Sequence, residues 1–119
     1  MKKIEVFERA IEEKATNLEE YGINSTMFWA YYNSKTVEND QIDLDDVIWE
    51  EDIEEIVGTL RENDIHEFTI SCTFSNLIDR LAAFEKHGFK MTGLTEVKVK
   101  YTDWLTGEYK VVPAIRMVG

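Results

Sequence analysis

The hydrophobic pattern of this chain changes character near His66. Before this point, apolar residues recur every three or four positions, which is typical of helices with one buried face. After it, Phe68 and Ile70 alternate with Thr69 and Ser71, which is typical of a strand with one buried face. A chain of 119 residues with this change predicts one α+β domain, residues 1–119, with a helical half (1–65) and a mixed half (66–119).

Three helices are predicted in the first half. The first covers residues 3–21 and ends at Gly22. The second covers residues 25–35, is capped by Asn24 or Ser25, and is apolar almost all the way round. The third follows an aperiodic linker, and its apolar stripe consists of Ile53, Ile56, Val57 and Leu60.

The second half predicts a strand, a helix and a hairpin. The strand runs from Phe68 to Phe74, and the helix after it ends at Gly88. A second strand near Val97 leads into the loop TDWLTGE and a third strand over residues 109–118. Pro113 cannot donate to a ladder, which places this third strand at a sheet edge.

The expected order is therefore ααα-β-α-ββ, with the helices packed on a small three-stranded mixed sheet. A right-handed crossover should make the first two strands parallel, and the C-terminal hairpin adds an antiparallel strand.

Charge is concentrated in one stretch. Residues 38–55 hold ten carboxylates and no Lys or Arg. Residues 1–65 carry 18 acidic against 6 basic residues, whereas residues 66–119 carry 6 against 7, and the net charge is −11. This negative charge repels nucleic acid and anionic membranes. It is suited to binding a basic protein partner or cations, or it serves only to keep the protein soluble.

The acidic stretch has three interpretations. A helix-loop-helix calcium site fails, because a loop starting at Asp43 puts Ile48 where Gly is required. The carboxylates could instead imitate a phosphate backbone and enter the basic groove of a nucleic-acid-binding protein. They could also form only a solvated loop and helix face. The partner-binding interpretation predicts an acidic surface made of Asp40, Asp43, Asp45, Asp46, Glu50, Glu51, Glu54 and Glu55.

Two aromatic residues are candidates for an interface. Trp29 belongs to a cluster on the second helix that forms core or the seam of a homodimer. Trp104 lies in the hairpin loop, where it either anchors a partner or folds back over the sheet.

No catalytic, metal or cofactor site is predicted. His66, His87 and Cys72 are the only His and Cys residues and lack metal-ligand spacing, and Cys72 shares the apolar parity of its strand. The single cysteine excludes an internal disulfide, and neither a signal peptide nor a membrane span is evident, so a cytoplasmic protein is expected. Residues 81–93 resemble a helix–strand segment of GNAT-superfamily acetyltransferases, without the acetyl-CoA-binding loop.

The segment VIWEEDIEEIVGTLRENDIHEFTIS, together with FEKHGFK, GLTEVKVKYTDW and TGEYKVVPAIRM, resembles a family of small acidic Firmicutes proteins. That family is labelled as a domain of unknown function and is found on phages, plasmids and conjugative elements. The resemblance spans residues 45–118 and implies a cytoplasmic protein of a mobile element, where small acidic proteins sometimes inhibit host nucleases.

We therefore expect a non-enzymatic protein-interaction module that modulates a basic nucleic-acid-binding protein. The alternatives are an acyltransferase-like (GNAT-type) remnant and a self-associating structural protein.

Overall fold

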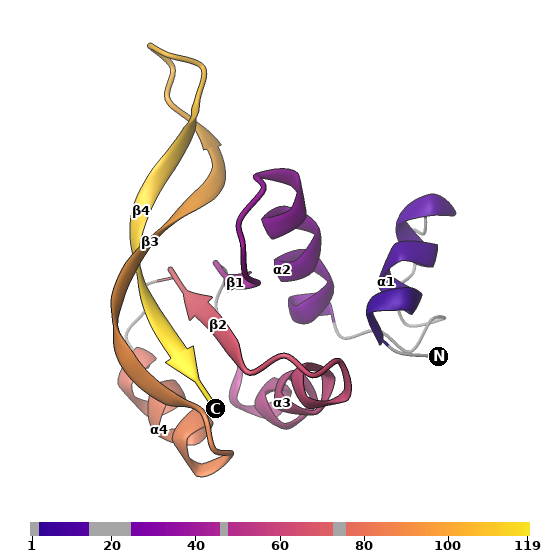
Figure 1. The fold of residues 1–119 in the computed structure, drawn as a ribbon, viewed down its shortest axis with the longest axis vertical. Coiled ribbons are helices and arrows are strands. Elements are labelled where there is room, and N and C mark those ends of the chain that lie inside the picture. Colours follow the sequence, from indigo (N-terminus) through magenta and orange to yellow (C-terminus); the bar gives the residue numbers. More distant parts are fainter. Residues whose placement is uncertain (1–2, 15–24, 46–47, 73–75) are drawn as a thin grey trace.

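A four-stranded mixed sheet forms the centre of the fold (Figure 1). The computed structural model describes residues 3–14, 25–45, 48–72 and 76–119. The strand order is β1-β2-β4-β3. β1 (Asp43–Leu44) runs parallel to β2 (Glu67–Ile70), and β4 (Tyr109–Val118) is antiparallel to both β2 and β3 (Lys90–Thr102).

The α+β class is confirmed, but the sheet differs from the prediction in two ways. β1 is a fourth strand, and its two residues are too few to produce a periodic pattern. β4 is a central strand, so the prediction of an edge position for Pro113 is wrong. The β2–β4 ladder ends at the pair Ile70–Ile115, so Pro113 lies beyond the end of β2 and its missing N–H breaks no bond to that strand. β2 and β3 run in the same direction, with β4 between them.

Four α-helices and one 3₁₀ helix accompany the sheet in the part of the chain that the structure describes. They are α1 (Lys3–Glu12), α2 (Ser25–Thr36), the 3₁₀ helix η2 (Glu50–Asp52), α3 (Ile53–Glu62) and α4 (Leu77–Lys86). α1 is shorter than the predicted 3–21, because a turn follows at residues 13–14, and residues 15–24 lie outside the described residues together with the predicted cap Asn24. α2, α3 and α4 coincide closely with the predicted helices.

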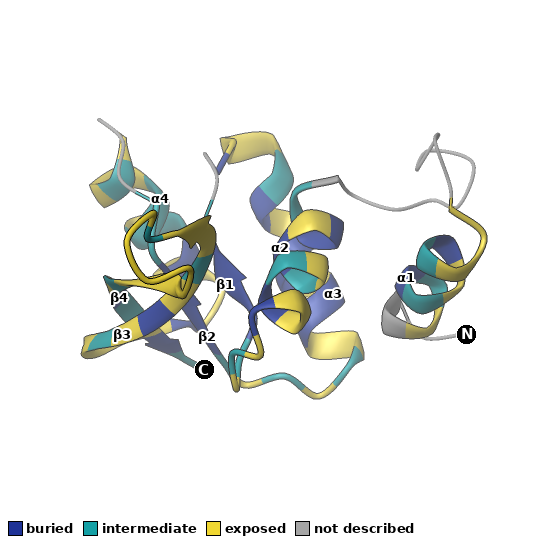
Figure 2. Ribbon diagram, turned by 90° about the horizontal axis from the view of Figure 1, so that it is seen from above, coloured by how far each residue is buried: buried dark blue, intermediate teal, exposed yellow. Residues whose placement is uncertain are grey.

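The core joins buried residues of all four α-helices with one face of the sheet. The Phe68 ring of β2 packs against Phe84 of α4 at 5.2 Å and against Phe89 at 5.1 Å. The predicted stripe of α3 is buried, and Ile56 and Leu60 are almost completely enclosed. Figure 2 shows this buried interior in blue, with exposed residues concentrated along the hairpin and the outer sides of the helices.

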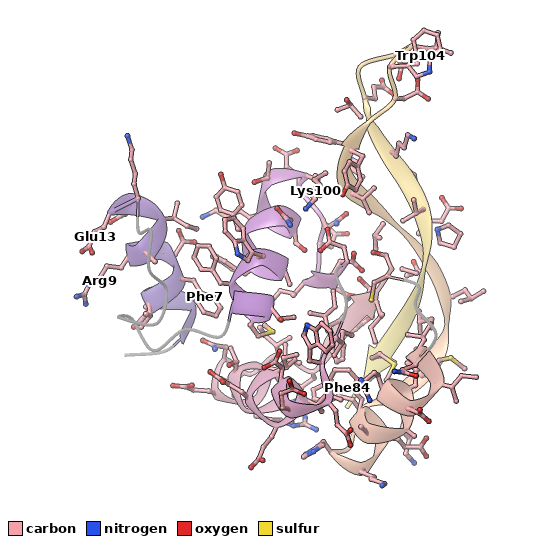
Figure 3. The ribbon with its side chains drawn as sticks, turned by 180° about the vertical axis from the view of Figure 1, so that it is seen from behind. Phe7, Arg9, Glu13, Phe84, Lys100 and Trp104 are labelled. Atoms are coloured by element: carbon pink, nitrogen blue, oxygen red, sulfur yellow. The ribbon has the colours of Figure 1, made fainter. Side chains whose placement is uncertain are left out.

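α1 packs against α2 through aromatic contacts. The Phe7 ring meets Phe28 edge-on at 5.9 Å, and the label in Figure 3 marks its position between the two helices. The Tyr31 hydroxyl donates a hydrogen bond to Glu8, and the Lys35 ammonium donates to the same carboxylate at 2.6 Å. These polar contacts lie at the edge of the aromatic contact between the two helices, and they fix the orientation of α1 relative to α2.

Candidate functional site

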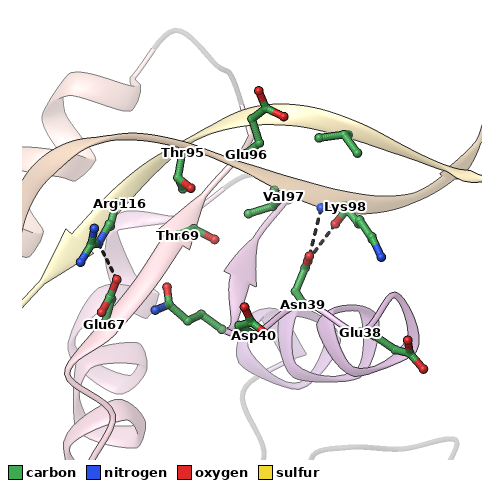
Figure 4. Close-up of a pocket in the computed structure, with 12 residues that line it drawn as sticks. Glu38, Asn39, Asp40, Glu67, Thr69, Thr95, Glu96, Val97, Lys98 and Arg116 are labelled. Carbon is green, nitrogen blue, oxygen red and sulfur yellow. Dashed lines mark hydrogen bonds and ion pairs between the residues drawn. The ribbon is translucent and has the colours of Figure 1, made fainter.

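The two faces of the sheet have different chemistry. Phe68 of β2 and Met117 of β4 point into the core, while their neighbours Thr69 and Arg116 point to the opposite side. A groove of about 600 Å³ opens on this second side. Figure 4 shows Thr95 and Val97 of β3 forming its upper wall, with the segment after α2 opposite them. This volume lies within the range of small-molecule and peptide-side-chain sites.

An ion pair crosses the floor of the groove. The Arg116 Nε atom lies 2.5 Å from the Glu67 carboxylate, and the two residues stand on neighbouring strands (Figure 4). A hydrogen bond from the Gln41 side chain and the Arg116 charge together hold the pKa of Glu67 below its usual value, although burial opposes them. Glu67 therefore stays ionised and neutralises Arg116.

The segment after α2 is attached to the outer edge of β3 by one side chain. The Asn39 Nδ2 atom donates to the Lys98 carbonyl oxygen at 2.8 Å, and the Lys98 N–H donates to Asn39 Oδ1 at 3.0 Å. These two bonds hold Glu38, Asn39 and Asp40 against β3 and so form the second wall of the groove (Figure 4).

A buried carboxylate lies beside the groove on β1. Asp43 is only 3% exposed, and it accepts hydrogen bonds from the Thr69 hydroxyl at 2.6 Å and the Ser71 hydroxyl at 2.5 Å. Its backbone N–H donates to the Ser34 hydroxyl of α2. Burial raises the pKa of Asp43, while the two hydroxyl donors lower it by a smaller amount. Asp43 thus joins β1, β2 and α2, and it does not belong to an exposed acidic surface.

The other described carboxylates of the predicted acidic surface fall in three places. Asp40 is exposed on the groove wall, and Asp45 is half-buried after β1. Four more are exposed on η2 and α3, namely Glu50, Glu51, Glu54 and Glu55. Asp46 lies outside the described residues. Arg80 approaches Glu50 at 3.9 Å, and its Nε atom donates to the Ile48 carbonyl oxygen.

Both predicted interface aromatics are exposed. Trp29 is 50% exposed on α2 and contacts Tyr32 edge-on at 5.8 Å. Trp104 is 87% exposed, and Figure 3 shows it at the tip of the hairpin, far from the helices. It does not fold back over the sheet. The tip is formed as predicted, because Asp103 Oδ1 accepts from the Leu105 N–H at 2.8 Å and Gly107 adopts a φ of +73°.

The Cys and His residues considered in the sequence, Cys72, His66 and His87, occupy structural positions. The predicted strand from Phe68 to Phe74 is too long, because β2 ends at Ile70, and Cys72 is half-buried against the core beyond the end of the strand. His66 Nδ1 lies 3.0 Å from the Gly119 carbonyl oxygen, and His87 directly follows α4. Among the described residues, no group of three or more His, Cys, Asp and Glu side chains could hold a metal ion. No described helix is both long and apolar enough to cross a membrane.

Sequence reasoning missed the groove. Its walls come from segments far apart in the chain, and Asn39, Glu67 and Arg116 show no motif that brings them together. The only indication in the sequence was that Glu67 and Thr69 are polar, at the strand positions that alternate with buried core residues.

Comparison with protein families gives one match. The model of a domain of unknown function, DUF7698, covers residues 26–118, which begins inside α2 and leaves α1 outside. No curated protein and no solved structure matches the chain.

Proposed function

The chain belongs to the DUF7698 family, and we propose that it acts as a non-enzymatic module that binds a basic partner protein. One observation carries this proposal: the two glutamates of η2 and the two in the first turn of α3 are all exposed, while the apolar stripe of α3 is buried. A surface of this kind attracts a basic protein over a long range and raises the rate of association.

Exposed aromatic residues support the same proposal. Trp49 precedes the acidic residues of η2 and is 56% exposed, and Trp104 stands at the hairpin tip. Tryptophan is enriched among the residues that contribute most to protein interfaces, because a large apolar ring loses its contact with water there. Carboxylates would provide attraction, and the tryptophans would provide the apolar contact.

The resemblance to small acidic Firmicutes proteins of mobile elements supports a more specific form of the proposal. The protein would act in the cytoplasm and occupy the nucleic-acid-binding surface of a host or element protein. Nucleic acid and this protein would then compete for the same basic groove, because both release its counterions.

The test compares two variants with four neutralised carboxylates each. The first replaces Glu50, Glu51, Glu54 and Glu55 with Gln, and the control replaces the exposed Glu12, Glu62, Glu85 and Glu108. Tagged proteins are used to capture partners from a Firmicutes lysate at low salt and at about 1 M salt, where the Debye length is about 3 Å. We expect the wild type and the control to retain a basic nucleic-acid-binding protein at low salt only. Equal capture by the first variant would refute the proposal.

A second candidate function is self-association through α2. The exposed Trp29–Tyr32 pair favours it, because an aromatic pair on a helix surface is suited to a seam between two copies. Sedimentation at rising concentration tests it, and a monomer throughout would exclude this function.

A further inference from the structure

The outer edge of β3 is open beside the groove. β3 is the last strand of the order β1-β2-β4-β3, so it has a strand neighbour on one side only. The Lys98 N–H and C=O point to the outer side, since both are bonded to Asn39. In an antiparallel pair the backbone groups of alternate residues point to the same side. The register from Leu94 to Lys98 is continuous, so Leu94 and Glu96 also direct their N–H and C=O outward.

The side-chain amide of Asn39 lies where the backbone of a fifth strand would pair with Lys98. Its amide donates and accepts as a strand backbone would, and it closes the edge at Lys98. The edge from Glu96 back to Leu94 lies next to this cap and carries no such cap among the described residues. Unpaired strand edges are templates for the addition of an extended chain, with main-chain bonds supplying affinity and alternate side chains supplying specificity.

The two sides of this edge would accept different side chains. The groove lining holds the carboxylates of Glu38, Asp40, Glu67 and Glu96 against the cations of Lys98 and Arg116, and Glu67 already neutralises Arg116, so its balance is negative. On the opposite side Leu94 is 77% exposed and Met91 is 58% exposed. A strand that alternates basic and apolar residues would place its cations in the groove and its apolar side chains over Leu94.

We propose that the outer edge of β3 from Leu94 to Glu96 binds an extended basic segment of a partner protein as a fifth strand. The segment alternates Lys or Arg with apolar residues. This inference rests on the proposed function, since it identifies the part of the basic partner that is bound and the main-chain groups that bind it. The exposed carboxylates of η2 and α3 would attract the partner, and the outer edge of β3 would bind its extended segment.

The probe is a synthetic ten-residue peptide that alternates Lys and Val, titrated into the full-length protein at low salt. A second peptide carries N-methyl groups on the alternate amides that would face β3, and a third replaces every Lys with Glu. We expect both to bind at least about tenfold more weakly than the first, which corresponds to about 1.4 kcal/mol. Hydrogen exchange should show new protection of the Leu94 and Glu96 amides when the first peptide binds.

Two variants and a control refine this test. Glu96→Pro removes one outward N–H at an edge position that tolerates proline, and it should weaken binding about tenfold. Asp40→Asn removes one groove carboxylate and should weaken binding several-fold. Glu85→Gln removes an exposed carboxylate of α4 and should leave binding unchanged. Hydrogen exchange on the wild type gives a result that does not depend on the folding of any variant.

The outcomes separate this inference from the proposed function. Equal binding of the N-methylated peptide, or protection only at α3, would overturn the β3 site while leaving the acidic module intact. Equal binding of the Glu peptide would overturn both. Protection of Leu94 and Glu96 by rising protein concentration alone would assign the edge to a second copy and would also overturn the inference.

Discussion

The side-chain amide of Asn39 bonds to both backbone groups of Lys98, donating at 2.8 Å and accepting at 3.0 Å. These bonds join the segment after α2 to the far edge of the sheet, although β1, the next strand along the chain, lies at the opposite edge. The connection therefore crosses one face of the sheet, and the groove lies beneath it (Figure 4).

Replacing Asn39 with Ala should release this segment. The loss of two partly exposed hydrogen bonds should lower the free energy of unfolding by about 1 kcal/mol. Hydrogen exchange at the Lys98 amide should become faster, which NMR can measure. Asn39→Asp is the matched variant, because it keeps the acceptor and replaces the donor with a negatively charged oxygen. Unchanged exchange at Lys98 in the Ala variant would contradict the role of Asn39.

The buried carboxylate of Asp43 should give the protein a distinct pH dependence. An unfolded Asp has a pKa of about 3.9, and the pKa of Asp43 is raised in the folded protein. Between these two values the folded protein holds a proton that the unfolded chain has lost. Stability from this group therefore falls as pH rises through the window and is constant above the folded pKa.

Urea unfolding of the wild type and Asp43→Asn over this pH range isolates the effect, because the other carboxylates cancel in the difference. The wild type should lose stability relative to the variant as pH rises. Asp43→Ala should cost about 1–3 kcal/mol at the acid end of this range, since the buried Thr69 hydroxyl loses its acceptor, and the cost should fall as pH rises. A difference between wild type and Asp43→Asn that does not vary with pH would show that Asp43 titrates normally.

The contact between α1 and α2 can be followed by the ionisation of Tyr31. Burial, followed by the hydrogen bond to Glu8 and the Glu8 charge, raises the pKa of Tyr31 to about 12. Glu8→Gln should lower this pKa while burial keeps it above the ordinary value of about 10. The measurement is the ultraviolet absorbance of tyrosinate, and Tyr31→Phe identifies the relevant step. The prediction fails if the absorbance step of Tyr31 occurs at the same pH in Glu8→Gln as in the wild type.

Trp104 should contribute to binding and not to stability. Because its side chain is 87% exposed, Trp104→Ser should change the free energy of unfolding by less than about 0.5 kcal/mol. It should remove the fluorescence component that acrylamide quenches most readily. Phe84→Ala is the contrasting variant, since this fully buried ring should cost about 3–5 kcal/mol. A large loss of stability in Trp104→Ser would place the ring against the body of the protein.

The elements that the sequence predicted well are those determined by local patterns. The α3 stripe, the Gly88 stop and the turn at Asp103 and Gly107 each depend on residues close in the chain. The position of β4 in the sheet depends on which strands pair with it, and no local sequence pattern shows that pairing. Pro113 suggested an edge, because the sequence could not show that β2 ends before reaching it.

The candidate site was harder to predict for the same reason. Glu67 and Arg116 become partners only through the β2–β4 register, and Asn39 and Lys98, which are 59 positions apart in the chain, meet only in the folded protein. Asp43 belonged to an acidic run in the sequence, yet its position opposite Thr69 in a two-residue strand buries it. Composition alone cannot distinguish such a buried acid from its exposed neighbours.

The central position of β4 has a consequence for how the sheet assembles. β3 and β4 are joined by the short loop of residues 103–108 and can pair early as a local hairpin, whereas β2 and β4 are separated by all of α4 and β3. Pairs that are distant in sequence carry a larger cost in chain entropy and form later. The hairpin should therefore form first and then attach to β2 through its β4 edge, which would complete the groove and the core in the same step.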